Sequence, residues 1–211
     1  MGTKERRERE RLKLRGKILD AARKLFIQQG YDAVTMRKVA QRIQYSPTAI
    51  YANFKDKEAL MRELCTADFQ KLADAFQQVA AIEDPIERLR RTGRAYIEFA
   101  IRYPNHYRLM FMTPRPAEIE ADTTGKGDVQ KDAYAFLISV VQDAMAKGAF
   151  KPEWKDADLL AQVLWAAMHG VVALRLHLVH SEDKWVDWRP FDATADAMTD
   201  ALYRGLLQEE R

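Results

Sequence analysis

Residues 18–60 read ILDAARKLFIQQGYDAVTMRKVAQRIQYSPTAIYANFKDKEAL, and this stretch predicts a helix-turn-helix together with its helix starts and stops. The first helix has apolar residues at helical spacing and ends at Gly30, because glycine is favoured just beyond a helix C-terminus. Thr35 supplies an N-cap hydroxyl for the second helix. The apolar positions of these two helices are Ile18, Ala22, Leu25, Phe26, Val39, Ala40 and Ile43.

The third helix begins at Ser46-Pro47, where an N-cap residue precedes a proline at the first helical position. We expect it to run from Pro47 to about Phe54, which is too short to be stable without its neighbours. A short helix held on two supporting helices is the geometry that enters the major groove of DNA. The stretch therefore predicts DNA binding.

The same residues resemble the DNA-binding domain of the tetracycline-repressor (TetR/AcrR) family. The pattern F-x-x-x-G-Y/F-x-x-x-T-x-R-x-V-A, followed by S-P-x-x-I-Y-x-x-F-K-x-K-E-x-L, covers roughly the first third of the chain. A match of this length at fixed spacing is highly specific. It is carried by Phe26, Gly30, Tyr31, Thr35, Arg37, Val39, Ala40, Ser46, Pro47, Ile50, Tyr51, Phe54, Lys55, Lys57, Glu58 and Leu60.

The N-terminal end of the third helix is expected to face the bases, because residues there approach the groove first. Thr48 can donate or accept a hydrogen bond, and Pro47 and Ala49 can contact a thymine methyl group. The family resemblance implies that Arg37 reaches a base, for which guanine is the natural partner. It also implies phosphate contacts, so the predicted DNA-binding residues are Thr35, Arg37, Lys38, Pro47, Thr48, Ala49, Tyr51, Lys55 and Lys57.

Alternative roles stay open for several of these residues. Tyr51 could serve mainly in packing, and Arg37 and Lys38 could belong to a solvated face. The chain also departs from the family at Gln44, a turn position that favours a positive φ and usually holds glycine, and at Thr48, where glycine is common. These departures put the operator preference in doubt but not the fold.

The charge of the chain is unevenly distributed along its 211 residues. Residues 1–65 hold 16 Lys and Arg against 8 Asp and Glu, a formal charge of +8, whereas the remainder carries −5. A basic end on an acidic remainder is expected when that end faces phosphate. The charge-dense arm at residues 4–17 either reaches a minor groove or extends the first helix through pairs such as Glu5–Arg9.

Other classes of protein are disfavoured by what the sequence lacks. It has no secretory signal, no run of 18 apolar residues that would span a membrane, and a lone cysteine, Cys65, which suits a reducing cytoplasm. It has no G-x-S-x-G, phosphate-binding glycine loop, H-E-x-x-H or C-x-x-C, so we expect no enzyme activity and no cofactor. His177 and His180 are weak metal ligands on their own, so no metal site is predicted.

Sparse glycine and proline and the near absence of strand patterns predict an all-α protein of about nine helices. We expect a DNA-binding domain at residues 1–62 and an effector-binding and dimerisation domain at 63–211. Helices after the helix-turn-helix are expected at residues 56–81, 85–103, 105–112, 129–147, 156–180 and 191–208, with a loop at 113–128.

The C-terminal part resembles the subgroup of the family with a W-x-x-x-H-G motif, here at residues 165–170. Aromatic and methionine side chains are dense around it, which favours a pocket for a small hydrophobic or aromatic effector. Arg102 and Glu98 are further candidates for its polar groups, and His169 is alternatively a core histidine. The predicted effector pocket comprises Phe99, Tyr103, Tyr107, Met110, Phe111, Trp165, Met168 and His169.

The last two helices carry apolar stripes and small residues, which favour close approach of a second copy. The resemblance implies a four-helix interface across a two-fold axis. A dimer is also what a DNA-reading short helix needs, because one half-site binds weakly. The predicted interface comprises Val163, Ala167, Val171, Leu174, Leu178, Met198 and Leu202.

These features together predict a cytoplasmic, nucleoid-associated homodimer that represses transcription from a palindromic operator and responds to a ligand. Its two reading helices must lie about 34–36 Å apart, so an effector that spreads them weakens binding. One alternative is a DNA-binding protein of the same fold that is controlled by a protein partner or has an architectural role. A more remote one is an all-α enzyme or carrier that retains a helix-turn-helix.

Overall fold

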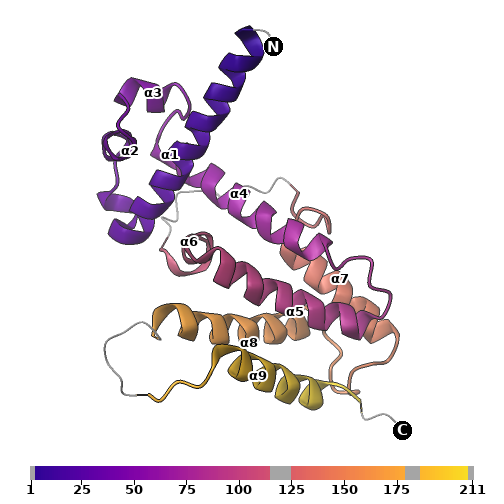
Figure 1. Cartoon of the computed structure of the whole chain (residues 1–211). Helices are drawn as coiled ribbons and strands as arrows, with labels where there is room; N and C mark the ends of the chain where they lie inside the picture. The colour runs from indigo at the N-terminus through magenta and orange to yellow at the C-terminus, as the bar shows by residue number, and fades with distance from the viewer. Residues whose placement is uncertain (1–2, 115–124, 179–185, 209–211) are drawn as a thin grey trace. The chain divides into compact units, whose positions relative to one another are not determined.

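A computed structural model describes residues 3–114, 125–178 and 186–208, and every regular element in these ranges is a helix (Figure 1). The all-α prediction is confirmed. The chain forms two compact units, one made of Met1–Phe69 and Asn105–Thr124 and the other of Gln70–Pro104 and Gly125–Arg211. The predicted boundary after residue 62 lies inside a continuous helix, which the two units share.

The first unit contains the helix-turn-helix. Its elements are α1 (Thr3–Ala33), α2 (Met36–Ile43), α3 (Pro47–Tyr51), the start of α4 (Lys57–Gln77), α6 (Pro104–Tyr107) and the π-helix η1 (Arg108–Met112). Both predicted caps are present: the Thr35 hydroxyl accepts from the amide of Lys38 at 3.2 Å, and the Ser46 hydroxyl from that of Ala49 at 3.3 Å. The core includes Ile18, Phe26, Val39, Ala40, Ile50, Phe54, Leu60 and Leu64.

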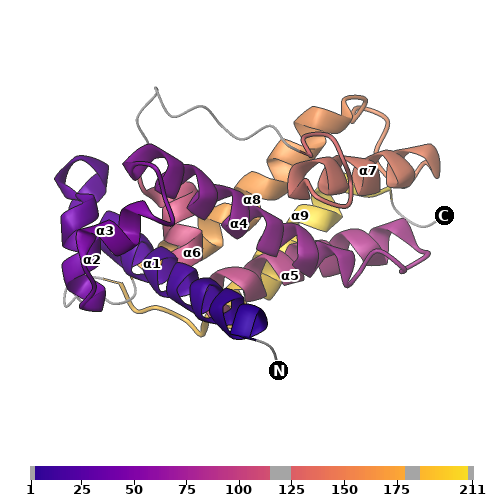
Figure 2. The same ribbon diagram turned by 90° about the horizontal axis from the view of Figure 1, so that it is seen from above.

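Helix α1 is longer than the sequence predicts, because the basic arm is helical from Thr3 onward. Its N-terminal end projects beyond α2 and α3 in both views (Figures 1 and 2). Arg11 donates to Glu8 at 2.8 Å, which is the i,i+3 pairing that supports an exposed helix. Gly30, with φ 77°, interrupts the helix where the sequence predicts its end.

Gln44 occupies the left-handed conformation that the family pattern predicts for this turn, with φ 60° and ψ 43°. A side chain with a Cβ is strained in this region by about 1–2 kcal/mol, whereas glycine is not. We expect Gln44→Gly to raise the free energy of unfolding by about 0.5–1 kcal/mol, since the added freedom of the unfolded chain offsets part of the gain. Urea denaturation measures the change, and a destabilised variant would contradict the prediction.

A buried ionic cluster joins three helices of the first unit. The Arg23 guanidinium on α1 donates to both carboxylate oxygens of Asp68 on α4, at 2.7 and 3.0 Å. The His106 ring of α6 lies 2.8 Å from the same carboxylate. The Arg23 and Asp68 side chains are only 6% and 1% exposed, so they depend on each other for the hydrogen bonds that water would otherwise supply.

The second unit is a bundle of the end of α4 with α5 (Pro85–Arg102), α7 (Ala133–Ala146), α8 (Ala157–His177) and α9 (Phe191–Leu206). Asp84, Asp132 and Asp156 cap the helices that follow them. Helix α8 packs against α5, α7 and α9 (Figure 1). Its bounds lie within the predicted 156–180, and His180 lies outside the described residues.

Helix α8 is long and apolar enough to cross a membrane by length and composition, with a mean hydropathy of 1.6 over its most apolar window. The core helix of a soluble bundle meets the same criterion, and α8 contacts three neighbouring helices. The sequence criterion of 18 consecutive apolar residues did not identify α8, because Gln162, His169 and Arg175 interrupt its apolar residues.

Candidate nucleic-acid interface

The polar residues of α2 and α3 form one exposed surface, while their apolar residues form the core beneath it. Val39, Ala40 and Ile50 are buried, and Tyr51 is 54% exposed. Tyr51 therefore faces solvent rather than the core, and its contact with DNA stays a prediction. The other exposed members of the predicted set are Thr35, Arg37, Lys38, Pro47, Thr48 and Lys55, and Ala49 is half-buried.

Arg37 and Lys55 are two predicted DNA-binding cations of this surface that are available to an external anion. Neither makes a hydrogen bond or an ion pair within the part of the chain that the structure describes. A guanidinium can donate two hydrogen bonds to a guanine, and an ammonium can contact a phosphate. Both are exposed, so their contacts with DNA would not require breaking an existing pair.

Lys38 and Lys57, by contrast, bind their own chain. The Lys38 ammonium donates to the carbonyl of Ala33 at 2.7 Å and to Gln29 at 3.0 Å. The Lys57 ammonium donates to the carbonyl of Tyr31 at 3.0 Å and lies 4.0 Å from the centre of its ring. Both lysines satisfy backbone carbonyls near the end of α1, so a phosphate contact would add to a structural role.

Sequence reasoning missed the residue that holds the recognition helix in place. Arg15 on α1 donates to the carbonyl of Asn53, just beyond α3, at 2.7 Å, and its guanidinium lies 4.3 Å from the centre of the Phe54 ring. It also donates to Glu63 on α4 at 2.8 Å. The sequence shows Arg15 only as one cation of a basic arm, because its partners are 38 and 48 residues away.

Tyr45 also lies next to the reading surface and was not predicted to do so, whereas Lys17 next to it is the last residue of the basic arm whose contact with DNA the sequence left open. Tyr45, in the turn before α3, is 42% exposed, and the Lys17 ammonium lies 5.8 Å from the centre of its ring.

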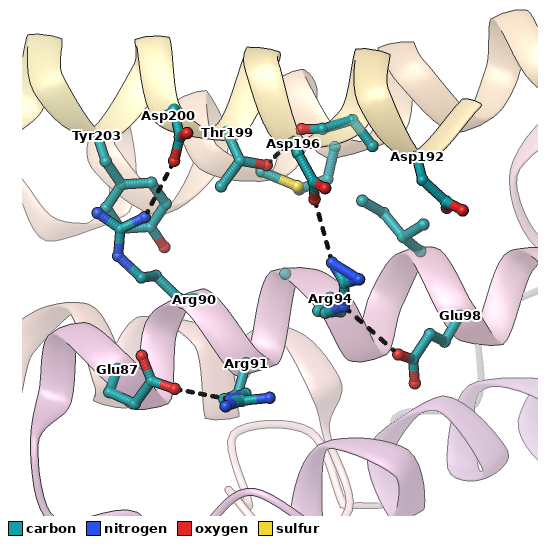
Figure 3. Close-up of a pocket in the computed structure, with 14 residues that line it drawn as sticks. Glu87, Arg90, Arg91, Arg94, Glu98, Asp192, Asp196, Thr199, Asp200 and Tyr203 are labelled. Atoms are coloured by element: carbon teal, nitrogen blue, oxygen red, sulfur yellow. Dashed lines mark hydrogen bonds and ion pairs between the residues drawn. The ribbon is translucent and has the colours of Figure 1, made fainter. Parts of the chain in front are cut away.

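The second unit holds a groove of about 580 Å³ between α5 and α9 (Figure 3). Two ion pairs cross it, Arg94–Asp196 at 3.1 Å and Arg90–Asp200 at 3.6 Å. Burial raises the pKa of Tyr203, whose ring stacks on the Arg90 guanidinium at 4.3 Å. The arginines Arg90 and Arg94 in this groove therefore already have carboxylate partners on α9.

A second groove of about 550 Å³ lies between α4 and α5. Its apolar lining comprises Ala75, Val79, Ala95, Phe99 and Tyr103, and its charged lining comprises Lys71, Asp74, Arg91, Arg94, Glu98 and Arg102. Charged residues line both grooves, and the sequence pointed only to Glu98 and Arg102 among them, because residues 20 or more positions apart contribute to each groove.

The predicted effector residues do not share one of these two grooves. Phe99 and Tyr103 line the α4–α5 groove, and Met168 lines the α5–α9 groove. Trp165 and His169 line neither, and instead meet at Tyr96, whose hydroxyl accepts from the Trp165 indole at 3.1 Å and lies 3.2 Å from His169.

Burial lowers the pKa of His169, which favours its neutral form, as expected for a core histidine. The remaining predicted effector residues are Tyr107, Met110 and Phe111, which belong to the first unit. There the Tyr107 and Phe111 rings lie 4.9 Å apart.

The outer faces of α8 and α9 expose small and apolar residues. On α8, Leu174 is 45% exposed and Gly170 is exposed, whereas Val171 is 9% exposed and packs within its own chain. The inclusion of Val171 in the predicted interface is therefore corrected. On α9 the exposed small residues lie four apart, at Ala193, Ala197, Ala201 and Gly205. Val163, Ala167, Leu178, Met198 and Leu202 are half-buried.

Comparisons with known proteins agree with this geometry. Residues 18–64 match the family of bacterial regulatory proteins of the tetR type, and residues 89–202 match the tetracyclin repressor-like C-terminal domain. The HTH-type transcriptional repressor Rv1474c of Mycobacterium tuberculosis is 42% identical over 59 residues, or 28% of this chain and 32% of its own length. The W-x-x-x-H-G subgroup stays a resemblance.

Similarity also extends over most of the chain. The HTH-type transcriptional regulator UidR of Escherichia coli strain K12 is 24% identical over 168 residues, covering 75% of this chain and 80% of its own. The fatty acid degradation regulator FadR of Bacillus halodurans has the same fold, with a TM-score of 0.71 and 20% identity over 90% of this chain and 95% of its own. This protein thus belongs to the tetracycline-repressor (TetR) family of helix-turn-helix transcriptional regulators.

Proposed function

We propose that this protein is a homodimeric, ligand-responsive repressor that binds a palindromic operator from the cytoplasm, at the nucleoid. The observation that carries this proposal is the exposed surface of α2 and α3, where Arg37, Thr48 and Tyr51 lie above a closed apolar core. Arg37 is free to read a base there, and Lys55 is free to contact a phosphate. The Arg15 contact to the carbonyl of Asn53 fixes the end of the recognition helix.

The outer faces of α8 and α9 support the dimer. Leu174 is exposed, although an apolar side chain gains from burial, and the exposed row at Ala193, Ala197, Ala201 and Gly205 is small enough to let a second helix approach closely. Two copies of this face would form a four-helix interface. The pairing would also supply the second recognition helix that a palindrome requires.

An effector in the second unit would act by preferring the state that does not bind DNA. Grooves of about 580 and 550 Å³ are within the usual size range of small-molecule sites. Control by a protein partner without a small molecule is the alternative. It would be favoured if no small molecule altered operator affinity.

Selection from a random DNA library with the purified protein tests the proposal directly. We expect the enriched sequences to contain an inverted repeat whose half-sites are about one helical turn apart, because two symmetric heads read two half-sites. Enrichment of a single half-site, or of no sequence, would contradict the dimeric operator. A reporter gene placed behind the selected operator then distinguishes repression from activation.

Alanine substitutions separate base reading from phosphate contact. Arg37→Ala should weaken operator binding about 5- to 150-fold and relax the preference at one position, because a base-contacting arginine contributes about 1–3 kcal/mol. Lys55→Ala should weaken all DNA sequences alike and reduce the salt slope by about one. Fluorescence anisotropy across a salt series measures both.

Lys155→Ala is the matched control, because Lys155 is an exposed lysine of the second unit and its loss changes the net charge equally. It should leave operator affinity unchanged. Wild-type affinity in both Arg37→Ala and Lys55→Ala would refute the assignment of this surface. Lys57→Ala is a poorer test, since it also removes the contact with Tyr31.

A further inference from the structure

We propose that the α4–α5 groove binds an amphipathic anion, with the acidic head group beside Tyr103 and the apolar body along the groove floor. Only the effect of this ligand on operator binding rests on the proposed function. The binding site itself is argued from the groove.

The head-group site is defined by two cations that face one aromatic ring. The Lys71 ammonium on α4 lies 3.9 Å from the centre of the Tyr103 ring, and the Arg102 guanidinium on α5 lies 5.5 Å from it. Neither cation has a carboxylate within ion-pair distance in residues 3–114, 125–178 and 186–208. Two neighbouring cations without a counterion repel each other, so an anion bound between them would be stabilised by both.

The floor beside these cations is apolar. Ala75 and Val79 contribute from the α4 side and Ala95 and Phe99 from α5. The Phe99 and Tyr103 rings lie 5.6 Å apart, so the apolar floor extends to the proposed head-group site. A hydrocarbon or aromatic body would lose water contact there, which adds to the attraction of the charge.

The charges of the α5–α9 groove show why an anion would prefer the α4–α5 groove. In Figure 3, Arg90 and Arg94 reach across to Asp200 and Asp196, so these arginines are already neutralised. At the next turn Glu98 and Asp192 bring two carboxylates to the same end of that groove. Arg91 and Arg94 line both grooves and are paired with Glu87 and Asp196, so the cations that distinguish the α4–α5 groove are Lys71 and Arg102.

Helix α4 connects the proposed binding site to the DNA-binding unit, so ligand binding could change operator affinity. It is continuous from Lys57 to Gln77, and it contributes residues to both compact units. Lys71 and Ala75 line the groove, while Lys57, Leu60 and Leu64 belong to the part of α4 that lies in the DNA-binding unit. A ligand that draws Lys71 toward Arg102 would bias the position of α4, and its binding would be coupled to operator affinity.

Isothermal titration calorimetry of the full-length protein with four matched octyl probes tests the ligand class. Octanoate and octyl phosphate should bind at least about tenfold more tightly than octan-1-ol, and octyltrimethylammonium should bind most weakly, because only the anions can form ion pairs with Lys71 and Arg102. The stronger of the two anions identifies a carboxylate or a phosphate head group. Inorganic phosphate alone should bind weakly, since it lacks an apolar body.

Variants locate the site. Lys71→Gln with Arg102→Gln should weaken octanoate binding at least about tenfold, whereas Lys71→Arg with Arg102→Lys should retain it, because the charges are kept. Arg189→Gln with Arg204→Gln is the matched control: it removes two exposed cations of the same unit that do not line the groove. Thermal denaturation of each variant confirms that it is folded.

Equal affinity for octanoate and octan-1-ol, or unchanged octanoate affinity in the Lys71→Gln, Arg102→Gln variant, would overturn the proposal. Operator affinity is measured separately with and without octanoate. Absence of specific DNA binding would refute the proposed function while leaving the binding site testable. Specific DNA binding without selective octanoate binding would refute only the groove.

Discussion

Replacing Ala201 by arginine is expected to convert the proposed dimer into a monomer and to lower operator affinity about 10²–10⁴-fold. Ala201 lies in the exposed row of small residues on α9, so its side chain would face the second copy. An arginine there would bury an unpaired charge in the interface, which costs far more than the lost methyl contact. A monomer would also lose the avidity of two linked half-site contacts. Sedimentation velocity measures the assembly, and fluorescence anisotropy the affinity.

Ala146→Arg is the matched control for this prediction. Ala146 is an exposed alanine in the last turn of α7, in the same unit but outside the proposed interface. It should leave both the sedimentation coefficient and the operator affinity unchanged. A Ala201→Arg protein that still sediments as a dimer would place the interface elsewhere. Val171→Arg is unsuitable, because Val171 is buried within its own chain and its substitution would disrupt the core.

Asp68→Leu is expected to lower the free energy of unfolding by about 3–5 kcal/mol. It would leave the Arg23 guanidinium, only 6% exposed, without the carboxylate that accepts two of its hydrogen bonds. The cost arises mainly from an unpaired buried charge rather than from the lost attraction. Replacing both partners, as Arg23→Met with Asp68→Leu, should therefore recover most of the lost stability. Urea denaturation of the wild type, Asp68→Leu, Arg23→Met and the double variant measures the cycle.

Asp20→Ala is the control, because Asp20 also pairs with Arg23, at 2.8 Å, but its side chain is 71% exposed. Water replaces an exposed carboxylate at little cost, so this variant should lose at most about 1 kcal/mol. If Asp20→Ala and Asp68→Leu destabilised the protein equally, burial would not be the cause. If the double variant were less stable than Asp68→Leu, the unpaired charge would not explain the loss.

The helix-turn-helix could be predicted in detail because its determinants are local. Thr35 and Ser46 cap helices that begin one residue later, and the amides that they bind are three residues away. Gln44 was recognised as a left-handed turn residue from its place between α2 and α3, and its φ is 60°. The third helix proved shorter than predicted, ending at Tyr51, because the buried Phe54 packs from a turn rather than from the helix.

The roles of individual charged residues depended on contacts that no local pattern contains. Lys55 and Lys57 are two residues apart and equally basic, but only Lys57 is bound to the carbonyl of Tyr31. From the sequence alone, both lysines were predicted to bind DNA. Asp68 was not distinguished from any other acidic residue of a long helix, although it lies at the centre of a buried ionic cluster.

Sequence by itself determined the helices, their caps and the family, because each depends on residue types at short, fixed spacing. Only the tertiary structure decided which charges are paired and which are free. It paired Arg15 with Glu63, placed Phe99 and Tyr103 in one groove and Met168 in another, and placed Lys71 and Arg102 around Tyr103. The physical reason is that burial and ion pairing depend on distance in space, and packing brings together side chains that are tens of residues apart in the chain.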